Sequence, residues 1–355
     1  MTARWVPEGF HTTSRLVLLL AAAASAASAS PPSIIGDGWG LDHVLVGVPG
    51  SDVARDVFEA GLGFSVIAVS RFPVAGLEHA IVPFPPAAYV ELFWAYQAPT
   101  GDVRPIHVLV RKKIVAGGGL AAYYLDVSPF QPAAEAMRSL GLKVSLPASP
   151  IVQTPDGKQA PGRWQYIDID PEDQAQQPLG VPGGPGVGFL EYESNSDRLK
   201  PERFQRALER AAREAPDSRR PAGEIHANTA RKLRSVWVAV PSVAAAVKQA
   251  ARFSFAAEVG HFVALGETAQ AVHCGQGTIV FFEPAHRHSP LAEFVRMHGL
   301  GPFGFSVEVA DLKTALQVVQ QGTNAKLTVQ RVGNRTSFIV PAESAAGTFI
   351  EFVQQ

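Results

Sequence analysis

The chain has 355 residues, of which 46% are hydrophobic and 18% charged, a composition typical of a globular protein with more than one core. The formal net charge of -1 gives no electrostatic basis for binding nucleic acid or an anionic membrane surface. The single cysteine, Cys274, excludes a disulfide framework within the chain and a structural zinc site made of paired thiolates.

The first 29 residues have the three parts of a secretory signal peptide. Arg4 and Arg15 precede the apolar run 16–20, and small residues at 27–29 form a cleavage site. The apolar run is shorter than the roughly 20 residues that a membrane span requires. We therefore predict a signal peptide over residues 1–29, a secreted or periplasmic protein, and no stable membrane span in the mature chain. An uncleaved membrane anchor or an organellar presequence is the alternative.

The stretch 41–49 alternates between two faces, as a β-strand does. Val44, Val46 and Val48 share one face, and His43 and Leu45 share the other. A helix over 51–60 and strands over 64–69, 77–84 and 89–94 are expected to follow. The first unit is therefore predicted to be βαβββ.

The same order recurs three times. The predicted segments are 121–127, 130–140 (helix), 142–145, 163–168 and 188–192; then 233–241, 243–253 (helix), 257–264, 269–274 and 278–283; then 303–309, 311–321 (helix), 327–331, 337–340 and 348–353. The glycines at 117–119 are interpreted as a hinge between units. Because one such unit cannot bury both faces of its sheet, we expect the units to pair.

The prediction is an α+β fold of four tandem βαβββ modules, arranged as two pairs. Each pair is expected to form a curved mixed β-sheet cup with helices outside, the valine faces packing under the helices. The first pair spans 36–194, a charged helix and linker span 195–231, and the second pair spans 232–355. The faces that vary between the repeats would line the cups.

Four stretches resemble the glyoxalase-like domain proteins of the vicinal oxygen chelate superfamily. They are Leu-Asp-His-Val at 41–44, Leu-Gly-Phe at 62–64, residues 80–92, and His-Ala-Asn-Thr at 226–229 followed by the strand at 233–241. The resemblance covers nearly all of the mature chain. It implies a cup that binds a small oxygenated organic molecule, and in many relatives a divalent metal held by His and Glu of the first and fourth strands.

Carried onto this sequence, the metal-ligand pattern is matched by His43 and Glu91, with Glu191 on the last strand of the second unit. The remaining position falls near Ala122, which cannot bind a metal. The resemblance thus implies one divalent metal, Zn, Mn, Fe or Mg, with Glu191 as a third ligand or a general base. In the second pair only Glu351 is a suitable ligand, so that half is expected to be a degenerate, metal-free scaffold.

Other arrangements of these side chains are compatible with the sequence. His43 could simply be hydrogen-bonded to Glu91 with no metal present. Alternatively, His43, His79 and Glu91 would form the two-histidine, one-carboxylate set of non-haem iron oxygenases. The predicted substrate pocket comprises Leu45, His79, Tyr89, Tyr124 and Tyr166.

Three kinds of function follow. The first is metal-assisted lyase, isomerase or dioxygenase chemistry in the cup of the N-terminal half. The second is non-catalytic binding or sequestration of a small molecule, as in bleomycin-resistance proteins. The third is a structural or interaction protein whose cup is closed by side chains. The expected partner is a small-molecule ligand, and the sequence leaves a homo-oligomer open.

Overall fold

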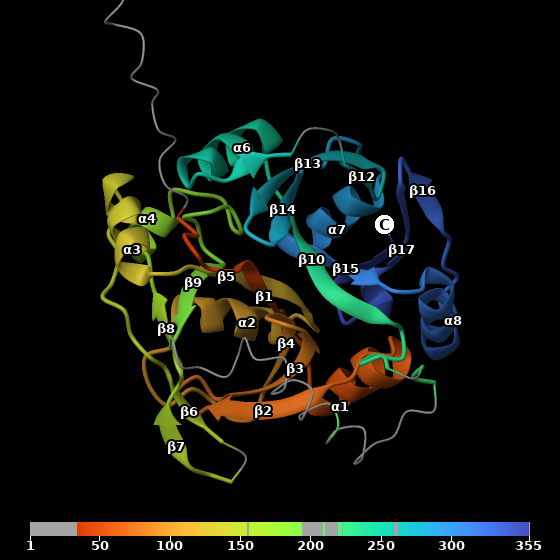
Figure 1. The fold of residues 1–355 in the computed structure, drawn as a ribbon, viewed down its shortest axis with the longest axis horizontal. Coiled ribbons are helices and arrows are strands. Elements are labelled where there is room, and N and C mark those ends of the chain that lie inside the picture. Colours follow the sequence, from red (N-terminus) through yellow and green to blue (C-terminus); the bar gives the residue numbers. More distant parts are fainter. Residues whose placement is uncertain are drawn as a thin grey trace, which may run out of the picture. The chain divides into compact units, whose positions relative to one another are not determined.

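The structure is a computed structural model that describes residues 34–154, 156–193, 209, 219–221, 223–258 and 262–354. The predicted signal peptide and most of the predicted charged helix lie outside these residues. Two curved sheets, both within one compact unit from Ser33 to Gln355, form the framework (Figure 1).

The first sheet is built around strand β1 (Gly40–Gly47). β1 runs parallel to β4 (Ala88–Ala95) and antiparallel to β5 (Gly119–Asp126). The strand order is β7-β6-β2-β3-β4-β1-β5-β9-β8. The other bounds are β2 Ile67–Phe72, β3 Leu77–Phe84, β6 Ile151–Gln153, β7 Gln159–Pro161, β8 Trp164–Ile167 and β9 Val187–Tyr192.

The second sheet repeats this plan around β10 (Ala230–Ala239), which pairs with β14 in parallel and with β15 antiparallel. Its order is β11-β13-β14-β10-β15-β18-β17-β16, and β12 pairs with β13. The bounds are β11 Ala256–Ala257, β12 Phe262–Ala264, β13 Glu267–Cys274, β14 Gly277–Phe282, β15 Gly301–Val309, β16 Gln330–Val332, β17 Arg335–Val340 and β18 Phe349–Gln354. The predicted α+β fold of tandem modules with two curved sheets is confirmed.

One helix of each module packs against the valine-rich face of its sheet. These helices are α1 Ser51–Val53 with its continuation η1 Ala54–Gly61, α3 Phe130–Ser139, α6 Val243–Arg252 and α8 Leu312–Thr323. Ser242 and Asp311 cap α6 and α8, because their side-chain oxygens accept bonds from backbone N–H groups of the first turn. Among the described residues, no helix is both long enough and apolar enough to cross a membrane.

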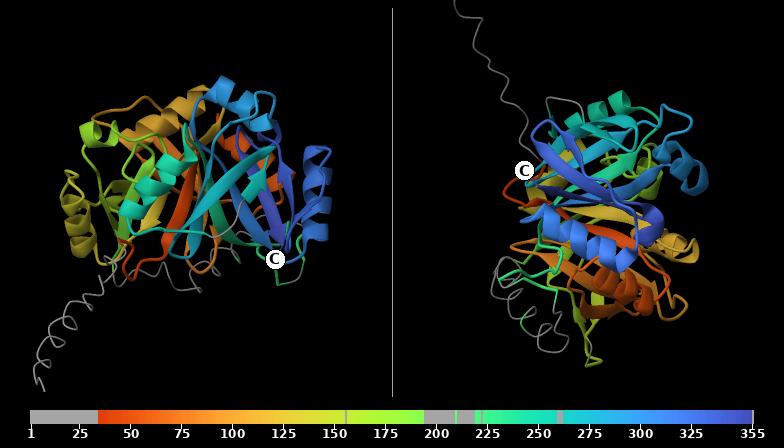
Figure 2. Two further views of the ribbon diagram at one scale, coloured as in Figure 1. Left: turned by 90° about the horizontal axis from the view of Figure 1, so that it is seen from above. Right: turned by 90° about the vertical axis from the view of Figure 1, so that its right-hand side faces the viewer.

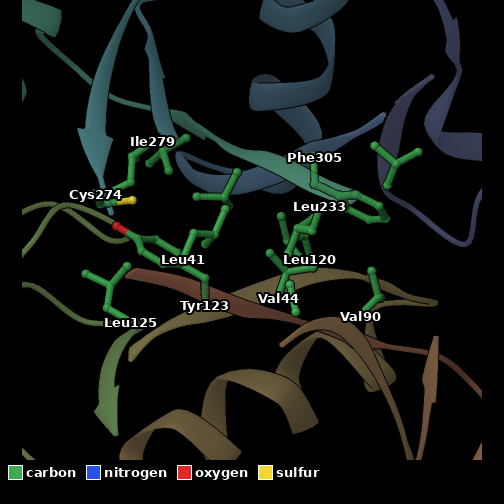
Figure 3. Close-up of a cluster of buried hydrophobic side chains, with 14 of the residues drawn as sticks. Leu41, Val44, Val90, Leu120, Tyr123, Leu125, Leu233, Cys274, Ile279 and Phe305 are labelled. Atoms are coloured by element: carbon green, nitrogen blue, oxygen red, sulfur yellow. The ribbon is translucent and has the colours of Figure 1, made fainter. Parts of the chain in front are cut away.

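The centres of the two valine-rich faces pack directly on each other. Figure 3 shows Val44, Val90 and Leu120 of the first sheet opposite Leu233 and Phe305 of the second, all buried in one cluster. At one side of this contact Gly40 forms an isolated antiparallel bridge with Gly275. Cys274 lies beside that bridge, completely buried in β13, as a small apolar residue would be. The halves therefore share one continuous core.

Each sheet also curls around a helix that the sequence pattern did not predict. α2 (Pro105–Val115) lies in the concave side of the first sheet, and α7 (Pro290–His298) in that of the second (Figure 1). Figure 2 shows α2 in ochre and α7 in blue at the same face of this unit. Both concave sides are thus partly filled by a connecting helix.

The second module departs from the predicted order of strands. Residues 142–145 form no strand and make only an isolated bridge between Val144 and Ile169. Pro147 and Pro150 follow closely, and proline cannot donate a ladder hydrogen bond. The chain instead forms the β6–β7 hairpin, which joins the far edge of the sheet at β2. A short helix, α4 (Pro171–Gln174), precedes β9.

Candidate functional site

His43 lies at the floor of the first cup and is almost completely buried. An irregularity in the β1–β5 ladder between Leu41 and His43 accompanies contact between the imidazole and the carboxylate of the preceding Asp42. The Nδ1 atom of His43 contacts Oδ1 of Asp42, and its Nε2 atom lies 3.3 Å from Oε2 of Glu91. Both ring nitrogens therefore face carboxylates of the protein.

Aromatic rings cover the two faces of this imidazole. Tyr89 stacks on one side, with ring centroids 4.3 Å apart, and Tyr124 on the other at 4.8 Å. The strand register explains the sandwich, because His43 is opposite Tyr89 of β4 and opposite Tyr124 of β5. The two predicted pocket tyrosines thus hold His43 in place.

Glu91 connects His43 to a second buried histidine. Its Oε1 atom lies 2.9 Å from Nδ1 of His79, whose Nε2 atom lies 3.2 Å from Oγ of Ser70. The predicted residues His43, His79 and Glu91 are therefore brought together, on three neighbouring strands. We call Asp42, His43, Glu91 and His79 the floor network.

Charges in the floor network stabilise one another against burial. Burial favours the neutral form of Glu91, but His79 and His43 outweigh it and hold the pKa of Glu91 far below its usual range. Burial likewise opposes a charge on His43, yet Asp42 and Glu91 raise its pKa. The network therefore contains an ionised Glu91 beside an imidazole that favours its protonated form.

The mouth of the cup carries a second polar group centred on Arg104, the residue before α2. Its Nε and Nη2 atoms donate to the two carboxylate oxygens of Asp168, at 3.2 and 2.6 Å, and Nη1 donates to Oη of Tyr124 at 3.1 Å. The guanidinium also lies over the ring of Tyr166, 3.3 Å from its centroid. Arg104 thus joins two predicted pocket residues, Tyr124 and Tyr166.

Tyr192 completes the mouth on the side of β9. Its hydroxyl lies 3.4 Å from that of Tyr89 and 3.5 Å from Oδ1 of Asp42. Tyr89, Tyr166 and Tyr192 are all only half-buried, unlike the floor beneath them. The three tyrosines are therefore more exposed than the floor network.

α2 fills the apolar part of the same cup. Ile106, Val110 and Ile114 are buried there in one cluster with the predicted pocket residue Leu45. His107 of α2 packs against the rings of Phe72 and Phe93. Burial, together with the charge of Arg104, lowers the pKa of His107 to about 3. The apolar end of the cup is thus closed, and its polar end lies at the mouth.

Glu191 does not join this group. Oε1 of Glu191 accepts a hydrogen bond from Oγ of Ser128 at 2.9 Å, and Oε2 accepts one from the backbone N–H of Phe130 at 3.2 Å. These bonds place it at the first turn of α3, on the helix-covered face of β9. Leu190 and Tyr192 occupy the cup face instead. Phe189 packs in the core between the sheets, and by strand alternation Glu191 shares its face.

Asp42, Arg104, Asp168 and Tyr192 belong to the site but were not predicted. The alternation of Leu190 and Tyr192 could have identified Tyr192. Asp42 is adjacent to His43, and its contact depends on the local irregularity of β1. Nothing in the sequence pairs Arg104 with Asp168, because 64 positions separate them and the helix that positions Arg104 was not recognised.

The donor atoms, as placed, do not fit the metal that the superfamily implies. Glu91 turns Oε2 toward His43 and Oε1 toward His79, one oxygen to each imidazole. On the side of the second module, the residues at the mouth are tyrosines, Tyr124 and Tyr192, and neither is a histidine or a carboxylate. Across the described residues, no three His, Cys, Asp or Glu side chains are arranged to hold a metal ion.

The comparisons with known proteins agree with the fold. Residues 41–253 match the family profile described as a glyoxalase-like domain. A hypothetical protein from Staphylococcus aureus is similar in structure, with a TM-score of 0.54, 10% identity, and coverage of 89% of this chain and 99% of that one. No curated protein sequence matches the chain.

Two enzymes are among the similar structures. A mutant of 4-hydroxymandelate synthase from Streptomyces coelicolor has a TM-score of 0.55 and 12% identity, covering 91% of this chain and 93% of that one. A fusion protein of a xylose isomerase-like TIM barrel with 4-hydroxyphenylpyruvate dioxygenase has a TM-score of 0.52 and 13% identity, covering 92% and 49%. Such identities show a common fold. Because the family profile matches more than half of the 355 residues, the chain belongs to the glyoxalase-like domain proteins.

Proposed function

We propose that the mouth of the first cup binds a small oxygenated organic molecule, held over the floor network by tyrosine hydroxyls. The observation that carries the proposal is the buried carboxylate of Glu91 between two imidazoles, one of which, His43, stacks on Tyr89, whose hydroxyl lies 3.4 Å from that of Tyr192. Burying charges is costly, and apolar side chains of similar volume often stabilise a core as well or better. Groups with strongly shifted pKa values gather at functional sites.

The geometry favours binding without turnover. Both nitrogens of His43 face carboxylates, so His43 already has partners inside the protein, whereas Nδ1 of His79 lies 2.9 Å from Glu91 without making a hydrogen bond. Glu191, the predicted general base, lies on the other face of β9. We therefore place non-catalytic binding ahead of lyase, isomerase or dioxygenase chemistry, and no step of the proposal uses a metal.

Calorimetric titration of the full chain tests this proposal. The probes are catechol, 4-hydroxymandelate and 4-hydroxyphenylpyruvate, of which the latter two occur in the names of similar structures. We expect saturable binding of at least one probe. Tyr89→Phe or Tyr192→Phe should weaken it about three- to tenfold, as the loss of one hydrogen bond predicts. Tyr96→Phe, which removes a hydroxyl outside the cup, is the matched control and should leave affinity unchanged.

Two results would contradict binding without turnover. One is a folded protein that binds none of the probes. The other is stoichiometric metal in the purified wild type, measured by elemental analysis and absent from His43→Ala, together with conversion of a probe to product. Equal, substoichiometric metal in both proteins and unchanged probe after prolonged incubation are the expected outcomes.

A further inference from the structure

Arg104 combines positive charge with a fixed orientation at the mouth. Only 17% of its side chain is exposed. The guanidinium lies between the ring of Tyr166 and the hydroxyl of Tyr124, and its forked edge faces Asp168. Such a planar fork binds both oxygens of a carboxylate at once, which a lysine cannot do.

The carboxylate that now occupies this fork can be displaced. Asp168 follows β8, at the edge of the sheet, and 36% of its side chain is exposed, about twice the value for Arg104. A carboxylate that is released from the fork there regains water, whereas Arg104 stays against its aromatic neighbours. A second carboxylate that takes the same N–H groups of Arg104 restores the bonds lost when Asp168 leaves, so it can compete for the guanidinium.

The floor network determines the orientation that an acidic ligand would adopt in the cup. The imidazoles of the floor network already face the carboxylates of Asp42 and Glu91, whereas Arg104 is the cation at the mouth, so the acid group of a ligand would pair with Arg104. Tyr124 connects the two places, because its ring stacks on His43 and its hydroxyl accepts from Arg104. A carboxylate at Arg104 would therefore leave the hydroxyl or carbonyl end of the same molecule toward Tyr89 and Tyr192.

From this arrangement we infer that the ligand is a small hydroxy or oxo carboxylic acid, and that its carboxylate replaces Asp168 on the guanidinium of Arg104. Asp168 is then an internal competitor, and Arg104 the residue that determines the class of ligand. This inference rests on the proposed binding function of the cup and adds the chemical group that the mouth selects.

Paired titrations with 4-hydroxymandelate and its primary amide test the inference, since the two probes differ only in the charge of one group. Wild type should bind the acid more tightly than the amide. Asp168→Asn removes the competitor and should raise affinity for the acid about tenfold, with affinity for the amide changed less than about twofold. Arg104→Gln should abolish the preference. Because Asp168→Asn is expected to gain affinity, misfolding cannot imitate the result.

Glu172→Gln is the matched control for charge. It also removes one carboxylate nearby, but its side chain is 88% exposed and pairs weakly with Lys143 at 3.9 Å. It should change neither affinity. Equal binding of acid and amide by wild type would overturn this inference and leave the proposed function standing, as would equal gains for both probes in Asp168→Asn. If neither these probes nor catechol bind any variant, the proposed function fails with it.

Discussion

His43, His107 and His226 are all buried, yet their neighbours favour different states of protonation. Two carboxylates raise the pKa of His43 despite its burial. Burial lowers the pKa of His226 to about 4, and no carboxylate compensates. Ser65 donates its backbone N–H to Nδ1 of His226 at 2.9 Å, so Nδ1 must be unprotonated and Nε2 donates to the carbonyl of Pro83. The neutral ring thus ties residue 226 to the first sheet.

The neutral state of His226 predicts a specific loss of stability in acid. Its ordinary pKa of 6.5 applies to the unfolded chain and a pKa of about 4 to the fold, so as pH falls the unfolded state binds the proton first. The stabilisation is complete above pH 6.5 and is lost between there and about pH 4. That shift corresponds to about 3 kcal/mol. Urea unfolding of wild type and His226→Gln across this window should show their stability difference shrinking as pH falls.

A substitution at His288, which is exposed, serves as the control for removing an imidazole. If the stability curves of wild type and His226→Gln run parallel from neutral to acid pH, the neutral buried state of His226 is wrong. The change in their difference is the informative quantity, because other groups also titrate in this range.

Prediction from sequence worked for single residues where strand alternation was regular. His43 and Glu91 share the cup face of adjacent strands, as their positions indicate, and His79, which is opposite Phe93 in the β3–β4 hairpin, reaches Glu91 diagonally. Glu191 was predicted to face the cup, but in β9 the neighbouring Tyr192 does so. A shift of one residue along a strand moves a side chain to the opposite face of the sheet. The pair Arg104 and Asp168 could not be predicted, because their contact depends on where α2 packs.

At the scale of elements, α2 is the main feature that the sequence reading missed. It has the signals of a helix, with Pro105 at its first position and Lys112 and Lys113 in its last turn. This segment, however, lies between the first and second modules, where the repeat predicts only a connection. The repeated βαβββ order has no place for it. The first strand and the helix of each module were predicted because four copies show the same pattern, whereas the predicted strand at 142–145 is absent from the second module.

The burial of α2 predicts unequal costs for two identical substitutions. Val110 is fully buried in the cup, whereas Val115, in the last turn of the same helix, is 88% exposed. Val110→Ala should lower the free energy of unfolding by about 2 kcal/mol, through lost apolar contacts and the cavity left behind. Val115→Ala should change it by less than about 0.5 kcal/mol. Denaturant unfolding measures both, and equal effects would show that α2 does not fill the cup.

At the scale of the whole molecule, two glycines, Gly40 and Gly275, join the two sheets through an isolated bridge. Gly275 has φ of +70°, and a Cβ atom on it would lie 2.4 Å from the carbonyl oxygen of Trp39 and 2.7 Å from Cα of Gly40. Backbone atoms cannot move aside as a flexible side chain can. The internal repeat predicted two pairs of modules, but it contains no signal for how their outer faces meet.

Gly275→Ala should therefore destabilise the contact between the sheets. Gly141 is the matched control, because its φ of +86° is equally left-handed and no atom lies within 4 Å of a Cβ built there. Gly141→Ala should cost about 1–2 kcal/mol for the backbone conformation alone. Gly275→Ala should cost about 2 kcal/mol more, from the clash across the sheets. Equal losses in thermal or denaturant unfolding would mean that the sheets can separate there without cost.

The buried Cys274 beside that glycine bridge gives the protein a native reporter of its own opening. Burial raises the pKa of the thiol to about 12, so very little thiolate forms in the closed state. Its Sγ atom lies 3.5 Å from the carbonyl oxygen of Gly277, inside the contact between the sheets. The rate at which an alkylating reagent modifies this single thiol therefore measures how often the structure around Cys274 opens, with no cysteine introduced.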